Sequence, residues 1–166
     1  MHININKNYL TFYKYKVKCA IGKRGIGYKK KEGDLITPKG QFKIKYILYR
    51  KDRVVKLRSK LKKIAIKSNM GWCNDPRSSK YNMLVKLPFK YGHEKLYKKE
   101  NVYDIILILN YNMRPIIKNK GSAIFIHIAK KNYKKTEGCI AMKKKHLLKI
   151  VKEIKPTTKI KIAHQK

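Results

Sequence analysis

Residues 121–141 read GSAIFIHIAKKNYKKTEGCIA and contain the most informative local pattern in the chain. Residues 122–129 alternate in a way that predicts a strand, with Phe125 and His127 on one face and isoleucines on the other. A polar, lysine-rich loop follows and leads to Cys139, 12 residues after His127. A strand followed by a loop of that length can fold back on itself, which predicts that the imidazole and the thiol come together.

The same period of two continues outward from this stretch and predicts further strands at residues 13–21, 42–48 and 159–162. Residues 103–109 form a nearly unbroken apolar run, which is typical of a strand covered on both faces. The chain has no internal repeat and no linker that would divide it. We therefore expect one mainly β domain over residues 1–166, a length that suits a single domain.

One helix is expected after Cys139, because apolar residues recur there at helical spacing and Pro156 ends the pattern. Its predicted buried stripe consists of Leu147, Ile150, Val151 and Ile154. Residues 50–103 show no regular period, and such a long connection is typical of a lid or a pocket wall.

The charge of the chain is extreme, with 44 Lys and Arg residues against nine Asp and Glu residues, a formal net charge of +35. This balance favours polyanionic partners such as nucleic acid, anionic lipid or anionic cell-wall polymers. An AT-rich genome, which also enriches Ile, Asn and Tyr, is the alternative explanation for many of the lysines. The 43% hydrophobic content excludes a globally disordered chain.

The three cysteines, Cys19, Cys73 and Cys139, are far apart and odd in number, which argues against a disulfide framework. The sequence contains no close cluster of Cys and His residues, so no metal site is predicted. Residues 1–19 lack the apolar run of a secretion signal, and no stretch is long enough to span a membrane. We therefore expect a cytoplasmic protein, with the periplasm as the less favoured location.

Cys139 and His127 are the best candidates for catalysis. Near the start of the predicted helix, Cys139 would lie in the positive field of the helix dipole, which lowers the pKa of a thiol and favours the nucleophilic thiolate. Gly138 would leave room for a substrate carbonyl, and N–H groups near Gly138 and Cys139 would bind an oxyanion. The alternative is a buried structural cysteine beside a core histidine, which the spacing alone does not exclude.

The residues themselves resemble the L,D-transpeptidase (YkuD-like) family. That family places a His on a strand and then a Ser/Thr-x-Gly-Cys motif, which matches His127 and the run Thr136, Glu137, Gly138 and Cys139. A second family element, Gly-Asp-x-x-Thr-Pro-x-Gly-x-Phe, matches residues 33–42, GDLITPKGQF. The resemblance extends from about residue 18 to residue 151.

The resemblance implies a mainly β fold of mixed sandwich or barrel-like sheets, with one helix following the catalytic Cys. It also implies a nucleophile at Cys139, a base at His127, and a backbone carbonyl that orients the imidazole. The family cleaves the bond between meso-diaminopimelate and a terminal D-Ala in peptidoglycan stem peptides. An amine then accepts the acyl group in a transpeptidase, or water accepts it in an L,D-carboxypeptidase, which we favour for a cytoplasmic protein. No cofactor or metal is required.

Three positions depart from the family pattern, where Glu137, Ala141 and Ile128 replace the usual His, the usual Arg or Asn, and a small residue. The His-to-Cys spacing is also short, as in a signal-less subgroup. Glu137 is expected either to bind a substrate ammonium group or to cap the following turn.

The middle segment resembles the same subgroup, and we expect some of its residues to line or cover the pocket as substrate-binding residues. They are Trp72, Asp75, Tyr81, Asn82 and His93. The alternative is a self-packed loop anchored by Trp72.

The competing functional hypothesis is a basic nucleic-acid- or polyanion-binding module on an inert YkuD-like scaffold. Tyr and Lys alternate over residues 13–18, a pattern suited to base stacking and phosphate contacts. The presence of both Cys139 and His127 argues against an inert scaffold. Stem peptides or muropeptides are therefore the favoured partners.

Overall fold

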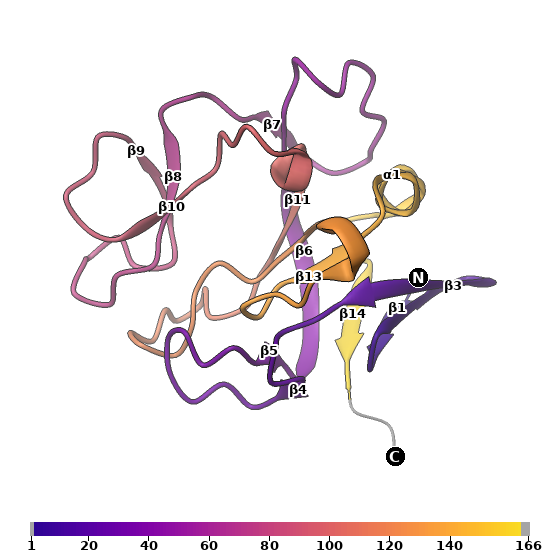
Figure 1. Cartoon of the computed structure of the whole chain (residues 1–166), viewed down its shortest axis with the longest axis horizontal. Coiled ribbons are helices and arrows are strands. Elements are labelled where there is room, and N and C mark those ends of the chain that lie inside the picture. Colours follow the sequence, from indigo (N-terminus) through magenta and orange to yellow (C-terminus); the bar gives the residue numbers. More distant parts are fainter. Residues whose placement is uncertain (1, 164–166) are drawn as a thin grey trace.

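Strand β6 (Gly40–Tyr49) closes the main sheet, because its two halves pair with different neighbours. Ile44–Tyr49 pair with β11 (Ile105–Leu109), whereas Gly40–Lys43 pair with β14 (Lys159–Ile162). The computed structural model describes residues 2–163 of the chain, and Figure 1 shows their arrangement. The strand order is β11-β12-β13-β3-β2-β1-β14-β6-β7, and the extra β6–β11 pairing closes the strands from β11 to β6 into a barrel-like sheet.

The remaining strands of this sheet are short and are β1 (His2–Asn6), β2 (Tyr9–Phe12), β3 (Tyr15–Ala20), β7 (Lys63–Ala65), β12 (Phe125–Ile128) and β13 (Ile140–Met142). Most neighbours are antiparallel, but β1 with β14, β6 with β7, and β12 with β13 are parallel. The mainly β fold with one helix is confirmed. The predicted strand at residues 122–129 is confirmed only in its central part.

Apolar side chains of alternate residues fill the barrel. Ile3 and Ile5 of β1 are buried while His2 and Asn4 are exposed, as the period of a half-buried strand requires. The same core takes up one face of α1 (Lys144–Glu153), on which Leu147, Ile150 and Val151 are buried. The predicted helical stripe is therefore confirmed.

The outer face of the closing strands is covered by residues from the segment that we expected to be irregular. This segment contains a three-stranded sheet made of β8 (Met70–Cys73), β9 (Leu84–Lys86) and β10 (His93–Lys95), which Figure 1 shows beside the barrel. The Trp72 ring of β8 meets Phe125 of β12 edge to face, with centroids 5.1 Å apart. These strands, MGWC, LVK and HEK, show no regular alternation of apolar and polar residues, which is why the sequence did not predict them.

Two small elements complete the sheet structure, β4 (Ile26–Gly27) and β5 (Thr37–Pro38), which pair with each other in parallel. Two single-turn 3₁₀ helices lie at Asn101–Tyr103 (η1) and Lys131–Tyr133 (η2). None of the helices within residues 2–163 combines the length and the apolar character that a membrane crossing requires.

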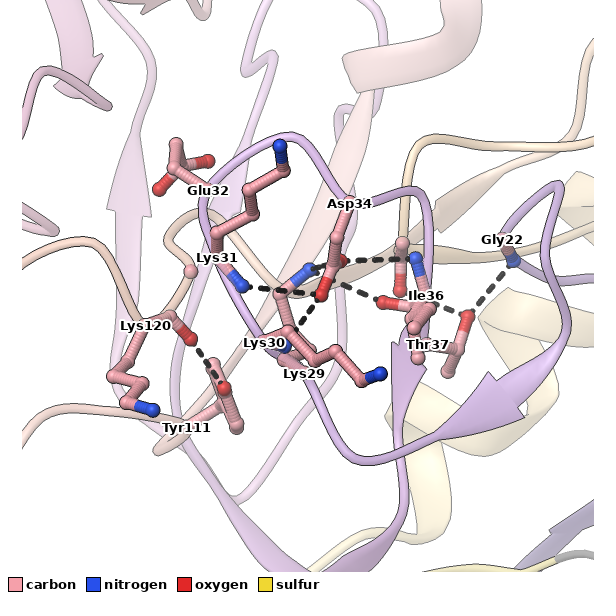
Figure 2. A network of polar contacts seen from close by, with 12 residues as sticks. Gly22, Lys29, Lys30, Lys31, Glu32, Asp34, Ile36, Thr37, Tyr111 and Lys120 are labelled. Carbon is pink, nitrogen blue, oxygen red and sulfur yellow. Dashed lines mark hydrogen bonds and ion pairs between the residues drawn. The ribbon is translucent and has the colours of Figure 1, made fainter.

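The loop between β4 and β5 is held by the buried carboxylate of Asp34, shown in Figure 2. Asp34 forms an ion pair with Lys29, and both side chains are nearly inaccessible to solvent. The carboxylate also accepts hydrogen bonds from the backbone N–H groups of Lys30 at 2.7 Å and Ile36 at 3.1 Å. Burial alone would raise the pKa of Asp34, but the Lys29 ammonium and these N–H groups hold it below its usual value.

Replacing Asp34 with Asn should lower the free energy of unfolding by about 3 kcal/mol, because the Lys29 ammonium would stay buried without its counter-ion. Urea unfolding followed by circular dichroism measures this change. The double variant Asp34→Asn/Lys29→Met is the matched control, and it should lose less stability than Asp34→Asn alone, because it leaves no unpaired charge. If the losses of unfolding free energy caused by the two substitutions simply add in the double variant, this account of the ion pair is wrong.

Candidate functional site

The parallel pairing of β12 with β13 brings His127 and Cys139 to one face of the sheet. Its register aligns Ile126 with Ile140 and His127 with Ala141. Since side chains alternate along a strand, His127 and Cys139 both point away from the barrel core that contains Ile126 and Ile140. The strand register thus places the imidazole and the thiol on the same face of the sheet, as their predicted approach requires.

The Cys139 thiol lies among backbone groups of the chain that leads into β12. Its Sγ donates to the carbonyl oxygen of Ala123 at 3.1 Å and accepts from the N–H of Phe125 at 3.4 Å. Burial raises the pKa of the thiol to about 12, and the Phe125 N–H opposes this shift only in part.

The expectation of a helix-activated cysteine is wrong. Cys139 is followed by β13, and α1 begins only at Lys144, so the thiol does not lie at the helix N-terminus. The helix dipole acts within the first turn and does not extend across a strand. In the free protein the thiol is therefore protonated at neutral pH.

His127 is 8% exposed and is held in one orientation by a backbone carbonyl. Its Nδ1 lies 2.9 Å from the carbonyl oxygen of Ile128. A carbonyl can only accept, so Nδ1 carries the proton and Nε2 keeps a free lone pair. Burial lowers the pKa of His127 to about 4, which keeps the ring neutral. The Tyr103 ring packs edge-on against the imidazole, with centroids 5.3 Å apart.

The turn that precedes Cys139 is fixed by two threonine side chains. Thr136 Oγ1 donates to the Cys139 carbonyl oxygen at 2.6 Å and accepts from the Gly138 N–H at 3.2 Å. Thr37 Oγ1 donates to the Gly138 carbonyl oxygen at 3.0 Å and accepts from the Gly22 N–H at 2.8 Å, and Figure 2 shows Thr37 and Gly22 in this network. The second sequence element thereby braces the cysteine turn.

Gly138 is needed for packing and backbone conformation. Its φ of 141° lies in the region that favours glycine, and a Cβ would lie 2.9 Å from the Ile36 carbonyl oxygen. The space on the Cβ side of Gly138 is thus taken by the Ile36 backbone, while Gly138 itself lines the cavity described below, and room for a substrate carbonyl there stays a prediction. The Gly138 N–H already donates to Thr136 Oγ1 and is therefore not free to bind an oxyanion.

A cavity of about 440 Å³, which we call the Cys139 cavity, has both Cys139 and His127 in its wall. Tyr103, Asn74 and Ser122 also contribute to the wall. Its charged lining consists of six lysines and three glutamates, namely Lys23, Lys29, Lys98, Lys130, Lys134, Lys135, Glu32, Glu94 and Glu137. Among residues 2–163, no group of His, Cys, Asp and Glu side chains is arranged to hold a metal ion.

None of the five predicted substrate-binding residues is in the wall of the Cys139 cavity, where their neighbours Asn74 and Glu94 lie instead. Two of the five support the chain that enters β12. Asn82 Oδ1 accepts from the Trp72 Nε1–H and from the Ala123 N–H, each at 3.0 Å. Trp72 therefore anchors a packed loop, as the alternative interpretation stated.

The other three have local structural contacts. The Tyr81 hydroxyl donates to Glu32 and accepts from the Gly121 N–H at 3.0 Å. Asp75 forms an ion pair with Arg77. His93 Nδ1 lies 2.8 Å from the Tyr91 carbonyl oxygen. Tyr81 thus contacts the cavity lining through Glu32, whereas Asp75 and His93 order the loop around β10.

Comparison with known proteins identifies the family of the chain. The family model of the YkuD L,D-transpeptidase catalytic domain matches residues 1–162. No curated protein matches the chain. Among solved structures, the helical cell shape determining protein Pgp2 from Campylobacter jejuni is 17% identical, with a TM-score of 0.49, and the match covers 99% of this chain and 48% of Pgp2. The chain thus spans about half of the length of Pgp2. On the family match, which covers nearly the whole sequence, the chain belongs to the YkuD family of L,D-transpeptidase catalytic domains.

Proposed function

We propose that the protein is a cysteine acyl-transfer enzyme that cleaves the bond between meso-diaminopimelate and a terminal D-Ala in peptidoglycan stem peptides. The observation that carries this proposal is the position of Cys139 and a correctly oriented His127 in one cavity. Family membership supports peptidoglycan as the substrate class. Water or an amine completes the reaction, and a cytoplasmic enzyme would use water.

The reaction begins with proton transfer from the Cys139 thiol to Nε2 of His127, the nitrogen whose lone pair is free. The thiolate attacks the diaminopimelate carbonyl carbon, and the Cys139 N–H stabilises the oxyanion. His127 then returns the proton to the D-Ala amine as the C–N bond breaks, leaving a thioester on Cys139. Attack by water or an amine, with His127 again accepting a proton, releases the product and restores the thiol.

Burial keeps both reacting groups neutral before substrate enters. It raises the pKa of the Cys139 thiol and lowers the pKa of His127, so the charged thiolate–imidazolium pair is disfavoured in the free protein. The pair must therefore form transiently, together with the attack on the carbonyl. Such a resting state also protects the thiol from unwanted oxidation and alkylation.

The alternative of a polyanion-binding module rests on charge and on exposed aromatic rings. Tyr13 and Tyr15 are exposed at the turn between β2 and β3, as stacking with a nucleic acid would require. The intact pair of Cys139 and His127 favours the enzyme instead.

Mixing the protein with a diaminopimelate tetrapeptide should release D-Ala and add the acyl tripeptide mass to the protein. Intact-protein mass spectrometry detects the thioester, and chromatography detects D-Ala. Cys139→Ala should abolish both signals, whereas Cys73→Ala, which removes a fully buried thiol outside the Cys139 cavity, should retain them. D-Ala release by Cys139→Ala would exclude the thioester mechanism. Exchange with an added D-amino acid identifies an amine acceptor.

The rate of Cys139 alkylation by iodoacetamide should rise about tenfold per pH unit from pH 6 to pH 10 without a plateau. Because burial raises the pKa of the Cys139 thiol to about 12, the thiolate is a minor species throughout this pH range. Peptide mass spectrometry separates Cys139 from the buried Cys19 and Cys73. A plateau between pH 6 and pH 8 would instead reveal a preformed thiolate–imidazolium pair.

A further inference from the structure

Acidic residues are concentrated at the Cys139 cavity in a chain that has very few of them. The whole sequence contains nine Asp and Glu residues, and three of them, Glu32, Glu94 and Glu137, line this cavity. Each of the four aspartates forms an ion pair with Lys or Arg, as Glu94 does with Lys98, whereas Glu32 and Glu137 form no ion pair among the described residues. Lysine is abundant everywhere, so the glutamates are the informative charges of the site.

Glu94 is linked to the imidazole through Lys98 and the Tyr103 ring. Its carboxylate forms an ion pair with Lys98 at 2.5 Å, and the Lys98 ammonium lies 4.6 Å from the centroid of the Tyr103 ring. The same Tyr103 ring packs against His127. The Glu94 side chain is nevertheless 31% exposed, so a ligand in the cavity can reach the carboxylate.

Glu137 lies next to the cysteine turn and has no internal partner. Its side chain forms no hydrogen bond or ion pair with any part of the chain between residues 2 and 163, and it is exposed. Turn capping, one of the two roles expected for Glu137, is performed by the Thr136 hydroxyl instead. Recognition of an ammonium group is the role that remains.

Both glutamates work against the nucleophile in the free protein. Burial is the main cause of the raised pKa of Cys139, and the negative charges of Glu94 and Glu137 raise it further. Glu94 also favours the protonated form of His127. A positive group bound between the two carboxylates would cancel their effect on the thiol, because opposite charges close together in a partly desolvated site compensate strongly.

A further polar group in the wall indicates that the cavity receives a polar ligand. Ser122 is 6% exposed and lines the cavity, and its hydroxyl lies near Tyr81 but has no partner in hydrogen-bonding geometry among the described residues. Buried hydroxyls are normally hydrogen-bonded, so this group is suited to a partner that the ligand supplies.

We propose that Glu94 and Glu137 form a subsite for a primary ammonium group of the substrate, directly beside Cys139. The inference rests on the proposed function for the source of that group, which is either the side-chain ammonium of diaminopimelate or the amine of an incoming acceptor. The bound cation makes thiolate formation depend on substrate. The enzyme is thereby activated by the molecule on which it acts.

The subsite is tested first with thiosulfonate reagents that modify Cys139 and carry either a cationic aminoethyl group or an anionic sulfonatoethyl group. The readout is the rate of Cys139 modification by the cationic reagent divided by the rate for the anionic reagent. This ratio cancels any change in thiol reactivity. Glu94→Gln and Glu137→Gln should each lower this ratio about fivefold at low salt. Glu100→Gln, which removes the same charge from an exposed site outside the cavity, should leave the ratio unchanged.

The source of the ammonium is tested with tetrapeptides whose diaminopimelate amine is free or N-acetylated. If the donor supplies it, acetylation should lower kcat/KM for D-Ala release about tenfold in the parent protein and have little effect in Glu94→Gln/Glu137→Gln. If the acceptor supplies it, acetylation should have no effect, and the same variants should raise the KM for an added D-amino acid.

An unchanged reagent ratio in both single variants would overturn the subsite. Equal loss of activity on free and acetylated peptides, with no change in acceptor KM, would also overturn it and would assign Glu94 to positioning of His127. Glu137 is exposed, so Glu137→Gln is not expected to perturb folding and keeps the test valid if Glu94→Gln unfolds. If no stem peptide reacts at all, the proposed function fails, while the reagent ratio still decides the subsite.

Discussion

The site depends on the parallel register of β12 and β13. An antiparallel return would need only a tight turn, but a parallel one requires a longer crossover, here the lysine-rich residues 129–139. The register then decides which side chains share a face. With Ile126 opposite Ile140, the apolar residues of both strands enter the barrel core, while His127 and Cys139 point outward together. A slip of one residue would bury the thiol in the barrel and destroy the site.

The two outward side chains are then covered by parts of the chain that are distant in sequence. The loop of Asp34 and Thr37 holds the cysteine turn from one side, and the layer containing Trp72 and Tyr103 covers the imidazole from the other. The Tyr103 ring packs against the His127 ring, and burial of both groups makes charge separation between thiol and imidazole unfavourable. Under the proposed function, the geometry is preorganised while the chemistry is held back until a substrate brings its own charges and dipoles.

The sequence was a good guide where a signal is local. Alternation located β6 and β14, an unbroken apolar run located β11, and helical spacing located α1. Two short sequence elements also singled out Cys139 and His127 as the candidate pair. The sequence failed where a feature depends on pairing between distant strands. β13 has only three residues and no recognisable period, so the sequence predicted a helix close behind Cys139 and missed the strand between them. Since β10 pairs with β8, Glu94 and not His93 lies in the cavity wall, an error of one residue that reverses the face.

A charged residue is more informative about ligand binding when its type is scarce in the chain. Lysine occurs throughout the chain, so six lysines around the cavity match the background and indicate no specific ligand. Glutamate and aspartate are scarce, and every aspartate has a visible structural partner. Some carboxylates are therefore better explained by what they bind than by folding. Such a carboxylate has no structural partner among the described residues, opposes the ionisation of the nearby thiol, and lines the cavity. Glu137 meets all three conditions, which is why it, rather than the large positive charge, is the residue that distinguishes recognition from general attraction.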